Sequence, residues 1–474
     1  MVNNNAPQEL KWSSVALSEV IDSGKRLDAT KFDIELKKAT QLINSSPYEL
    51  FSITGDNGIC DSYRPGICKR IFVSKMDNSI EMLTPSQVTE INPKAEKYLS
   101  TLMEKTISNW FVKNGEILLS CSGTIGNITL VSKTLNQKCV SQNMIRIVPK
   151  SEEDTGYIYA YLKSKTGQMF LTHNNYGAVI QHIDPDHLQT VKIPFASKNI
   201  RNRIHDLIIR SYELRDESNV LLDKAEQMLI EELKLPPIEE MQNADDTVET
   251  FNVKLSELNK RTDASYHVPV VKAIVKHLKE HADEVTTIGD ERISKQVILP
   301  GRFKRVYVEE GYGKVLFGGK QIHELDPSGK KYLSIAKHSK RMNEELQINE
   351  NTTLITRSGT IGKVVLVPRH WESWIASEHI IRVVPASKEM AGYISVFLSS
   401  DYGYELITRY TYGSVVDEID DNHVRDIAFP LLKDKDKQAQ INALALEANE
   451  KRYQAYCLEQ EALKIMDEEV IYAQ

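Results

Sequence analysis

The chain has 474 residues, of which 41% are hydrophobic and 26% are charged, and its formal net charge is −7. This length predicts two or three domains, and the composition excludes disordered, collagen-like and low-complexity chains. Five cysteines, none of them in a Cys-x-x-Cys pair, argue against both a disulfide framework and a zinc ribbon. No apolar run approaches the ~18 residues that a membrane span needs. We therefore expect a cytoplasmic protein that does not contact a membrane.

The charge is distributed unevenly along the chain. Residues 1–197 and 251–432 each carry a net charge of +1, whereas residues 198–250 and 433–474 carry −6 and −3. Two nearly neutral segments therefore alternate with two acidic ones. Because association depends on local charge, the acidic total does not exclude a nucleic-acid-binding surface on the neutral segments.

The two neutral segments are copies of one another. Ser122-Gly-Thr-Ile-Gly126 recurs as Ser358-Gly-Thr-Ile-Gly362, at a distance of 236 residues. Distances of 234 to 236 residues also relate Lys69-Arg70 to Lys304-Arg305, Lys97-Tyr-Leu-Ser100 to Lys331-Tyr-Leu-Ser334, Ile145-Arg146 to Ile381-Arg382, and Tyr176-Gly177 to Tyr412-Gly413. Matches in one order at nearly constant spacing indicate a duplication. We call residues 1–196 repeat 1 and residues 251–431 repeat 2.

Each repeat is predicted to consist mainly of β-sheet. In repeat 1, residues 116–120, 128–131 and 144–148 have the composition of short strands bounded by Gly, Asn or Pro. The SGTIG sequence lies between the first two strands and predicts a tight turn. A helix is expected at about residues 155–172, where apolar residues recur on one face. The predicted fold class is therefore α+β, with a mainly antiparallel sheet in each repeat.

A long helix is predicted after each repeat. The first occupies residues 197–236 and ends at Pro236-Pro237, an acidic linker follows at 237–250, and the second helix occupies residues 432–474. Heptad spacing predicts an apolar seam on each helix. The predicted seam residues are Leu207, Leu214, Leu221 and Met228 in the first helix, and Ile441, Leu444, Leu458 and Ile465 in the second. Because neither helix can bury its seam alone, we expect them to pair as an antiparallel coiled coil, with a pseudo-two-fold relation between the repeats.

The sequence contains no recognised catalytic, metal or cofactor motif. There is no GxGxxG, and residues 313–320, the nearest approach to a P-loop, lack a required glycine and the Ser/Thr. His187 and His423, which match one another in the two repeats, each lie three residues after an aspartate, Asp184 or Asp420, that is predicted to cap a helix. Without clustered ligands no metal site is expected. We therefore predict no catalytic residue, no metal and no cofactor in this chain.

The ordered motifs resemble the specificity (S) subunits of Type I restriction-modification systems. The resemblance rests on the two SGTIG turns, on Arg26-Leu-Asp-Ala-Thr30 and Arg261-Thr-Asp-Ala-Ser265 near the start of each repeat, and on the helix after each repeat. It implies two target recognition domains, residues 1–196 and 251–431, and two spacer helices.

The resemblance also implies a function and partners. The chain would be a non-catalytic subunit that reads a bipartite double-stranded DNA target, one half-site with each recognition domain. Its helices would bind two adenine-N6 methyltransferase subunits, on which S-adenosylmethionine is expected. Whether an ATP-dependent restriction subunit also joins stays open.

Basic and polar side chains at turns and strand ends are the candidates for DNA contact. Lys and Arg position a protein on phosphates, whereas polar and aromatic side chains on loops can reach base edges. For several of them, solvation or turn formation explains the residue type equally well. The candidates are Arg64, Lys69, Arg70, Ser122, Thr124, Asn174 and Tyr176 in repeat 1, and Arg302, Lys304, Arg305, Arg357, Ser358, Thr360, Arg409, Tyr410 and Tyr412 in repeat 2.

Two other functions stay open on the sequence alone. The near-neutral repeats also suit a bivalent protein–protein adaptor, and an enzyme with an unrecognised motif is the third alternative. Steep salt dependence of duplex binding would distinguish the DNA reader from the adaptor. Binding of S-adenosylmethionine by the isolated chain would instead indicate a methyltransferase.

Overall fold

A computed structural model of the chain describes residues 14–22, 32–75, 78–122, 125–173, 182–241, 251–258, 261–327, 329–413 and 415–473. The chain forms two compact units. Unit 1 comprises Met1–Glu213 and Cys457–Gln474, and unit 2 comprises Leu214–Tyr456. Each unit therefore combines one repeat with a part of both long helices. Among the described helices, none is long and apolar enough to cross a membrane.

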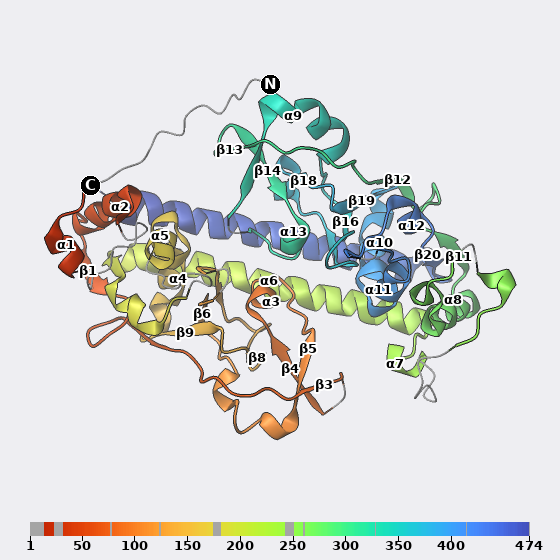
Figure 1. Cartoon of the computed structure of the whole chain (residues 1–474), viewed down its shortest axis with the longest axis horizontal. Coiled ribbons are helices and arrows are strands. Elements are labelled where there is room, and N and C mark those ends of the chain that lie inside the picture. Colours follow the sequence, from red (N-terminus) through yellow and green to blue (C-terminus); the bar gives the residue numbers. More distant parts are fainter. Residues whose placement is uncertain are drawn as a thin grey trace. The chain divides into compact units, whose positions relative to one another are not determined.

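Unit 1 contains three sheets (Figure 1). The first has the order β2-β9-β6-β7 and is antiparallel throughout, with β2 at Cys60–Tyr63, β9 at Met144–Pro149, β6 at Ile117–Ser120 and β7 at Ile128–Leu130. The second has the order β3-β5-β4-β8, with β3 at Phe72–Val73, β5 at Lys97–Ser100, β4 at Ser79–Leu83 and β8 at Cys139–Val140. Its β4–β8 pair is parallel. The third pairs β1 (Glu49–Ser52) with β10 (Lys192–Phe195).

Unit 2 repeats this topology strand for strand. Its sheets have the orders β12-β19-β16-β17, β13-β15-β14-β18 and β11-β20. The strands are β11 (Glu284–Thr287), β12 (Ser294–Ile298), β13 (Tyr307–Val308), β14 (Gly313–Phe317), β15 (Lys331–Ser334), β16 (Thr353–Thr356), β17 (Val364–Leu366), β18 (Ile375–Ala376), β19 (Ile380–Pro385) and β20 (Ala428–Leu431). The duplication read from the sequence is thus a duplication of fold, and the predicted α+β class with mainly antiparallel sheets is confirmed.

The shorter helices differ more between the repeats than the strands do. Unit 1 has α1 (Leu17–Asp22), α2 (Ile34–Asn44), α3 (Pro85–Val88), α4 (Thr155–Lys163) and α5 (Lys165–His173). Unit 2 has α7 (Ile238–Met241), α8 (Pro269–His281), α9 (Ile335–Arg341), α10 (Lys388–Ser399), α11 (Asp401–Thr408) and α12 (Asp421–Arg425). The N-caps predicted at Asp184 and Asp420 are both present, each as a capping box completed by the histidine three residues later.

The single helix predicted at residues 155–172 is wrong, because the chain breaks at Ser164 into α4 and α5. The Ser164 hydroxyl accepts a hydrogen bond from the Gly167 backbone N–H at 3.0 Å and so caps α5. Gly167 lies so close to the preceding helix that a Cβ there would be 2.0 Å from the Tyr161 carbonyl oxygen. Ser400 and Gly403 make the same break between α10 and α11. Periodicity alone missed it, since the apolar face continues across the break.

A buried arginine joins the two four-stranded sheets of each repeat. The Arg146 guanidinium, on β9, donates to the Met144 carbonyl at 2.6 Å and to the Val140 carbonyl on β8 at 2.7 Å. Arg382, on β19, donates to the Ala376 carbonyl on β18 at 2.6 Å. Burial lowers the pKa of each guanidinium to about 10. Each buried guanidinium thus donates hydrogen bonds to carbonyl groups that would otherwise lack a partner, and it links a strand of one sheet to a strand of the other.

The two long helices are α6 (Lys198–Leu233) and α13 (Lys435–Ile465), which continues as a π-helix over Met466–Ile471. α6 ends where Lys234 adopts a positive φ of 50°, two residues before Pro236. In unit 1, Arg203 pairs with Glu469 at 3.0 Å. In unit 2, Glu217 pairs with Lys451 at 2.7 Å. In unit 1 the start of α6 thus lies against the π-helix that continues α13, and in unit 2 the middle of α6 lies against the middle of α13.

The seam between the helices is offset by one residue from part of the prediction. On α6, the most deeply buried apolar residues are Ile204, Ile208, Ala225, Leu229 and Leu233, with buried Ser211 and Ser218 between them. On α13, Ile441, Ala445, Ala448, Ala455, Ala462 and Met466 are buried. Among the predicted seam residues, Leu214, Ile441 and Ile465 are buried, whereas Leu207, Leu221, Met228, Leu444 and Leu458 are only half-buried.

This offset has a physical reason. Each helix must pack both against its partner helix and against a repeat. Small residues form the line of closest helix–helix approach, and flanking residues such as Leu207, Met228 and Leu444 pack against the cores of the repeats. A heptad pattern alone cannot tell which of two adjacent apolar columns faces the partner helix. The pseudo-two-fold relation of the repeats stays a prediction.

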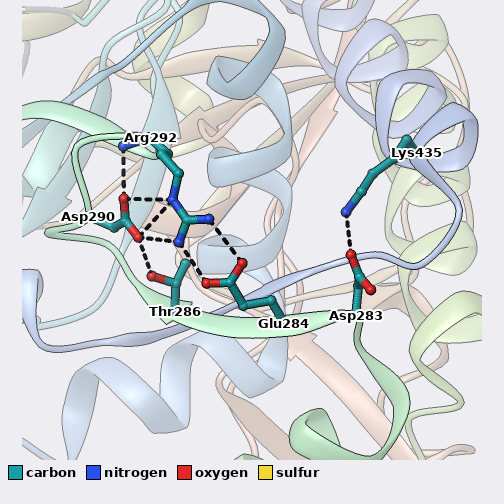
Figure 2. A network of polar contacts seen from close by, with 6 residues as sticks. All are labelled: Asp283, Glu284, Thr286, Asp290, Arg292 and Lys435. Atoms are coloured by element: carbon teal, nitrogen blue, oxygen red, sulfur yellow. Dashed lines mark hydrogen bonds and ion pairs between the residues drawn. The ribbon is translucent and has the colours of Figure 1, made fainter.

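A network of charged side chains lies near the start of α13 in unit 2 (Figure 2). Lys435, the first residue of α13, pairs with Asp283 at 3.0 Å, next to β11. Arg292 contacts Glu284 at 2.7 Å and Asp290 at 2.6 Å, and Asp290 also accepts a hydrogen bond from Thr286. These bonds lower the pKa of the Asp290 and Glu284 carboxyl groups. The network is exposed, so it orders the β11 loop rather than adding much to stability.

Candidate nucleic-acid interface

The SGTIG sequence of repeat 2 forms the predicted turn between β16 and β17. Gly359 and Gly362 adopt positive φ angles of 77° and 85°, which favour glycine. A Cβ at Gly362 would also lie 3.0 Å from the Tyr404 ring. The Ser358 hydroxyl lies 2.8 Å from His379 Nδ1. The turn thus presents a paired hydroxyl and imidazole, with Thr360 exposed beside them.

An acidic side chain next to this turn holds two arginines. Glu418 contacts Arg302 at 2.6 Å and Arg357 at 2.5 Å, one through each carboxylate oxygen. The Arg302 side chain is 69% exposed, whereas that of Arg357 is 9% exposed. Arg302 can therefore reach a ligand by leaving its carboxylate, but Arg357 is placed to fix the turn and Glu418. The role of Arg357 as a DNA contact stays a prediction.

The predicted basic pair of repeat 2 separates into two roles. Arg305 pairs with buried Glu378 at 2.7 Å and contacts the Tyr307 hydroxyl at 3.2 Å. Lys304 is exposed, and no ion pair or hydrogen bond of its side chain is found within the described part of the chain. Lys304 is thus available for a phosphate oxygen, whereas Arg305 helps to position the segment next to β13.

A further basic element lies in α9, which the sequence analysis did not identify. Lys337 and Lys340 are exposed on this helix. Arg341, its last residue, donates to the Gly301 carbonyl at 3.0 Å and stacks over the Phe303 ring at 4.7 Å. The helix is therefore attached to the segment that carries Arg302 and Lys304. Repeat 1 has a short 3-10 helix, Thr101–Met103, after the equivalent strand.

The candidate surface of repeat 1 is built from different side chains. Arg64 donates to the Gln142 carbonyl at 3.1 Å and pairs with Asp184 at 3.3 Å. Arg70 lies over the Trp110 ring at 5.7 Å, and Lys69 is exposed. Ser122 forms a β-bridge with His182. Thr124, Asn174 and Tyr176 lie outside the described residues, as does the Arg-Leu-Asp-Ala-Thr sequence at 26–30.

The three remaining candidates in repeat 2 differ in how much of each side chain is exposed. Tyr410 is 8% exposed, stacks on His423 at 5.2 Å and donates to the Asp426 carbonyl. Arg409 lies over the Tyr266 ring at 4.4 Å. Tyr410 and Arg409 therefore contribute to packing in unit 2, and their role as DNA contacts stays a prediction. Tyr412 is 42% exposed at a β-bridge with Glu418.

Besides the lysines of α9, sequence reasoning missed Glu378, His379 and Glu418. Glu378 and His379 precede β19, at the positions that Gln142 and Asn143 occupy before β9. The sequence did contain a signal. The two equivalent segments both begin with serine and end with an apolar residue, but Gln142-Asn143 in repeat 1 is Glu378-His379 in repeat 2. Their proximity to the SGTIG turn depends on the β16–β19 pairing, which joins residues 24 or more apart in sequence.

Comparison with known proteins finds a family model that matches part of the chain. Residues 63–213 match the family model of the Type I restriction modification DNA specificity domain. No curated protein sequence matches the chain.

Solved structures resemble the chain over most of its length. The S subunit of a Type-I restriction-modification system from M. genitalium is 14% identical, covers 91% of this chain and 96% of that chain, and has a TM-score of 0.34. The HsdS subunit from Thermoanaerobacter tengcongensis is 11% identical, covers 89% and 100%, and has a TM-score of 0.27. A structure from a study of type I R-M complex assembly and conformational transition is 12% identical, covers 89% and 98%, and also has a TM-score of 0.27.

The family model covers the part of the chain in which the first repeat is best defined. It begins at the end of β2 and extends through the sheets of repeat 1 into the first half of α6. The scores of the structural matches are too low to bear on individual residues. Residues 63–213 of this chain are therefore similar to the Type I restriction modification DNA specificity domain.

Proposed function

We propose that the chain is a non-catalytic specificity subunit that reads a bipartite DNA target, one half-site with each repeat. The observation that carries the proposal is the specificity-domain match in repeat 1 together with the same three sheets, in the same strand orders, in repeat 2. A domain that recognises DNA targets and occurs twice in one chain is suited to two half-sites. Linking two readers also turns two weak binding events into one strong one.

In this proposal, exposed basic side chains position each repeat on the DNA backbone. Lys69 in repeat 1 and Lys304 in repeat 2 are equivalent in the duplication and both are exposed. Arg302, Lys337 and Lys340 would extend the phosphate-binding surface of repeat 2. Such contacts contribute affinity without sequence information.

Base recognition is assigned to the SGTIG turns and the residues beside them. In repeat 2, the Ser358 hydroxyl and His379 form a donor–acceptor pair, and Thr360 and Tyr412 are exposed nearby in the same repeat. In repeat 1, Ser122 and Asn143 occupy the positions equivalent to Ser358 and His379. Because asparagine in repeat 1 is replaced by histidine in repeat 2, the two half-sites are expected to differ in sequence.

The long helices are proposed to bind the partners. Two methyltransferase subunits that carry S-adenosylmethionine and modify adenine at N6 would dock on the two long helices, which lie within the acidic segments 198–250 and 433–474. An acidic surface is unsuited to phosphates and suited to a basic protein surface. An ATP-dependent restriction subunit is a further candidate partner.

The test measures binding of the full chain, reconstituted with its methyltransferase, to a duplex library at several salt concentrations. Affinity should fall steeply with salt, and footprinting should show two protected half-sites. Lys304→Glu should weaken binding to all duplexes, about tenfold, and reduce the salt slope by about 2, since one attractive charge is replaced by a repulsive one.

Lys279→Glu, an exposed lysine in α8 outside the candidate surface, serves as the control and should leave both quantities unchanged. Salt-independent binding, or a single protected site, would contradict the proposal. Binding that needs no DNA and captures two copies of a peptide would favour the adaptor.

A further inference from the structure

The last turn of α8 carries a cluster of metal-ligating side chains that the DNA-binding surface does not use. Within the described part of the chain, His277, Glu280 and His281 form a group whose ligand atoms all lie within 4.8 Å of one another. Glu280 is exposed and the two histidines are half-buried. The spacing places all three on one face of the helix, because residues three and four apart are neighbours on a helix surface.

The hydrogen bonds of the two imidazoles fix which nitrogen of each ring is free. His277 Nε2 lies 2.8 Å from the Lys234 carbonyl and 3.1 Å from the Leu233 carbonyl, at the end of α6. His281 Nδ1 lies 3.0 Å from the His277 carbonyl. A carbonyl oxygen can only accept, so the proton of each neutral ring lies on the nitrogen that faces the carbonyl. The other nitrogens, His277 Nδ1 and His281 Nε2, therefore carry lone pairs.

This is the arrangement that metal-ligating histidines adopt. A histidine that binds a metal through one nitrogen almost always donates the other N–H to a carbonyl or carboxylate, which fixes the tautomer and orientation of the ring. Both rings already have that second partner. They also lie face to face, with centroids 4.1 Å apart and planes 18° apart, so that their lone pairs run side by side within the cluster.

We propose that His277, Glu280 and His281 bind one divalent transition-metal ion of the Zn²⁺ class. Two imidazole nitrogens and one carboxylate oxygen are a ligand set that zinc accepts, with water in the remaining position. Two nitrogens on a tetrahedral zinc lie about 3.3 Å apart. Binding of one metal by both nitrogens therefore requires the two rings to rotate out of their stacked arrangement about their side-chain torsions. This inference is independent of the DNA-binding function.

The ion would connect two elements of unit 2. His277 would bind the metal through Nδ1 while its Nε2–H donates to the last carbonyls of α6. A metal ion withdraws electron density from the ring and strengthens that donation, and the carbonyl end of a helix favours positive charge. Metal binding should therefore hold the end of α6 against α8 more firmly.

The test is a zinc titration of the full chain, in competition with a chromophoric chelator at neutral pH. The exposed Cys457 thiol is a competing ligand, so all variants carry Cys457→Ser. The parent should bind one equivalent of Zn²⁺, and His281→Gln should weaken that binding by at least about tenfold. Glu280→Gln should weaken zinc binding less than His281→Gln does, because the glutamine keeps an oxygen atom at the site although a neutral amide is a poorer ligand than a carboxylate. His338→Gln, in α9, is the matched control and should bind like the parent.

A second measurement separates loss of a ligand from loss of the fold. His277→Gln also removes the hydrogen bonds to α6, so His281→Gln is the decisive variant and its thermal unfolding without metal should match that of the parent. Zinc should slow amide exchange in residues 230–235 of the parent and not of His281→Gln. A parent that binds no zinc, or a His281→Gln variant that binds it as tightly as the parent, would overturn the proposal.

Discussion

The two repeats attach to the long helices at equivalent positions but with different side chains. In unit 1, His205 Nδ1 accepts a hydrogen bond from the Gly156 N–H at 3.2 Å, at the start of α4. In unit 2, the Asn442 side-chain oxygen accepts the equivalent bond from the Gly392 N–H at 2.8 Å. In both places a Cβ on the glycine would clash with the long helix. Both units thus attach a glycine N–H to the long helix, but the acceptor is an imidazole nitrogen in unit 1 and an amide oxygen in unit 2.

A second attachment shows the same substitution of one group for another. The Tyr212 hydroxyl, on α6, accepts from the Leu130 N–H at 3.1 Å at the end of β7. Asn449, on α13, donates to the Val367 carbonyl at 2.9 Å, just after β17. Repeat 2 adds an aromatic contact, in which the His370 ring stacks on Tyr456 at 3.9 Å. A buried polar group needs a hydrogen-bond partner, and in each unit a different pair of groups meets this need between the sheet and the long helix.

The two repeats therefore share key residues in their interiors, whereas the residues beside their turns differ. Arg146 and Arg382 perform the same task with the same residue type, as do Tyr157 and Tyr393, whose hydroxyls bond the carbonyls of Pro194 and Pro430. Beside the turns, by contrast, Cys121 and Asn143 are replaced by Arg357 and His379. A shared scaffold with different turn residues is what two readers of different half-sites require.

The largest effect is expected from the shared buried arginine. Arg382→Met removes charged hydrogen bonds and leaves the Ala376 and Leu346 carbonyls without their donor, so the free energy of unfolding of unit 2 should fall by about 3–5 kcal/mol. Arg146→Met should cost unit 1 a similar amount. Denaturant titration of both variants checks this, with the exposed Arg302→Met as the control. Unequal losses would show that the two arginines are not equivalent.

A substitution in the seam between α6 and α13 is expected to raise the free energy of unfolding instead of lowering it. Arg452 is buried, and its contacts to Ser218 and Asn219 are long, at 3.3 and 3.4 Å. Burial lowers the pKa of Arg452 to about 10, and no neighbouring charge offsets that effect. Arg452→Met should therefore stabilise unit 2, by about 1–3 kcal/mol, since a buried charge is replaced by an apolar chain of similar length.

The same denaturant titration measures the Arg452→Met effect. Arg215→Met, the half-buried equivalent on α6, should change stability less. Destabilisation by Arg452→Met would mean that Arg452 contributes net stability, through helix pairing, that its static contacts do not explain.

Part of this architecture follows from local sequence and part does not. The SGTIG turn of repeat 2, the Asp184 and Asp420 caps and the extent of α6 depend on residues close in sequence, and patterns predict them well. The attachment by His205 and Asn442, the arginine link between sheets and the pairing of Ser358 with His379 depend on contacts between distant residues. The SGTIG duplication located the turns, but only the strand pairing showed what lies beside them.

The difference at the turns predicts a change of specificity confined to one half-site. His379→Asn gives repeat 2 the residue that repeat 1 has at this position, and it replaces the ring whose Nδ1 contacts Ser358. Selection from a random duplex library should show a changed preference in one half-site, of about 1–2 kcal/mol for the affected base pair. The other half-site should be unchanged. Asn143→His should do the converse, and a change in both half-sites would contradict independent reading.

The smallest effect concerns pH and distinguishes the two attachments directly. His205 Nδ1 accepts the Gly156 N–H, so it must be unprotonated in the folded protein, and burial lowers the pKa of His205 below its ordinary value. As pH falls through that ordinary value, the unfolded chain takes up a proton that the folded chain does not. The stability of unit 1 is therefore fully present at neutral pH and declines below it.

Because His205 is only half-buried, solvent screening limits this loss to about 1 kcal/mol. His205→Asn keeps an acceptor, as Asn442 does in unit 2, and cannot titrate. The variant should match the parent at pH values well above the ordinary pKa of histidine and exceed it in acid, when unfolding of unit 1 is followed as a function of pH. Asn442→His should transfer the same pH dependence to unit 2. An unchanged acid profile in His205→Asn would assign the titration of unit 1 to other groups and leave the two attachments energetically alike.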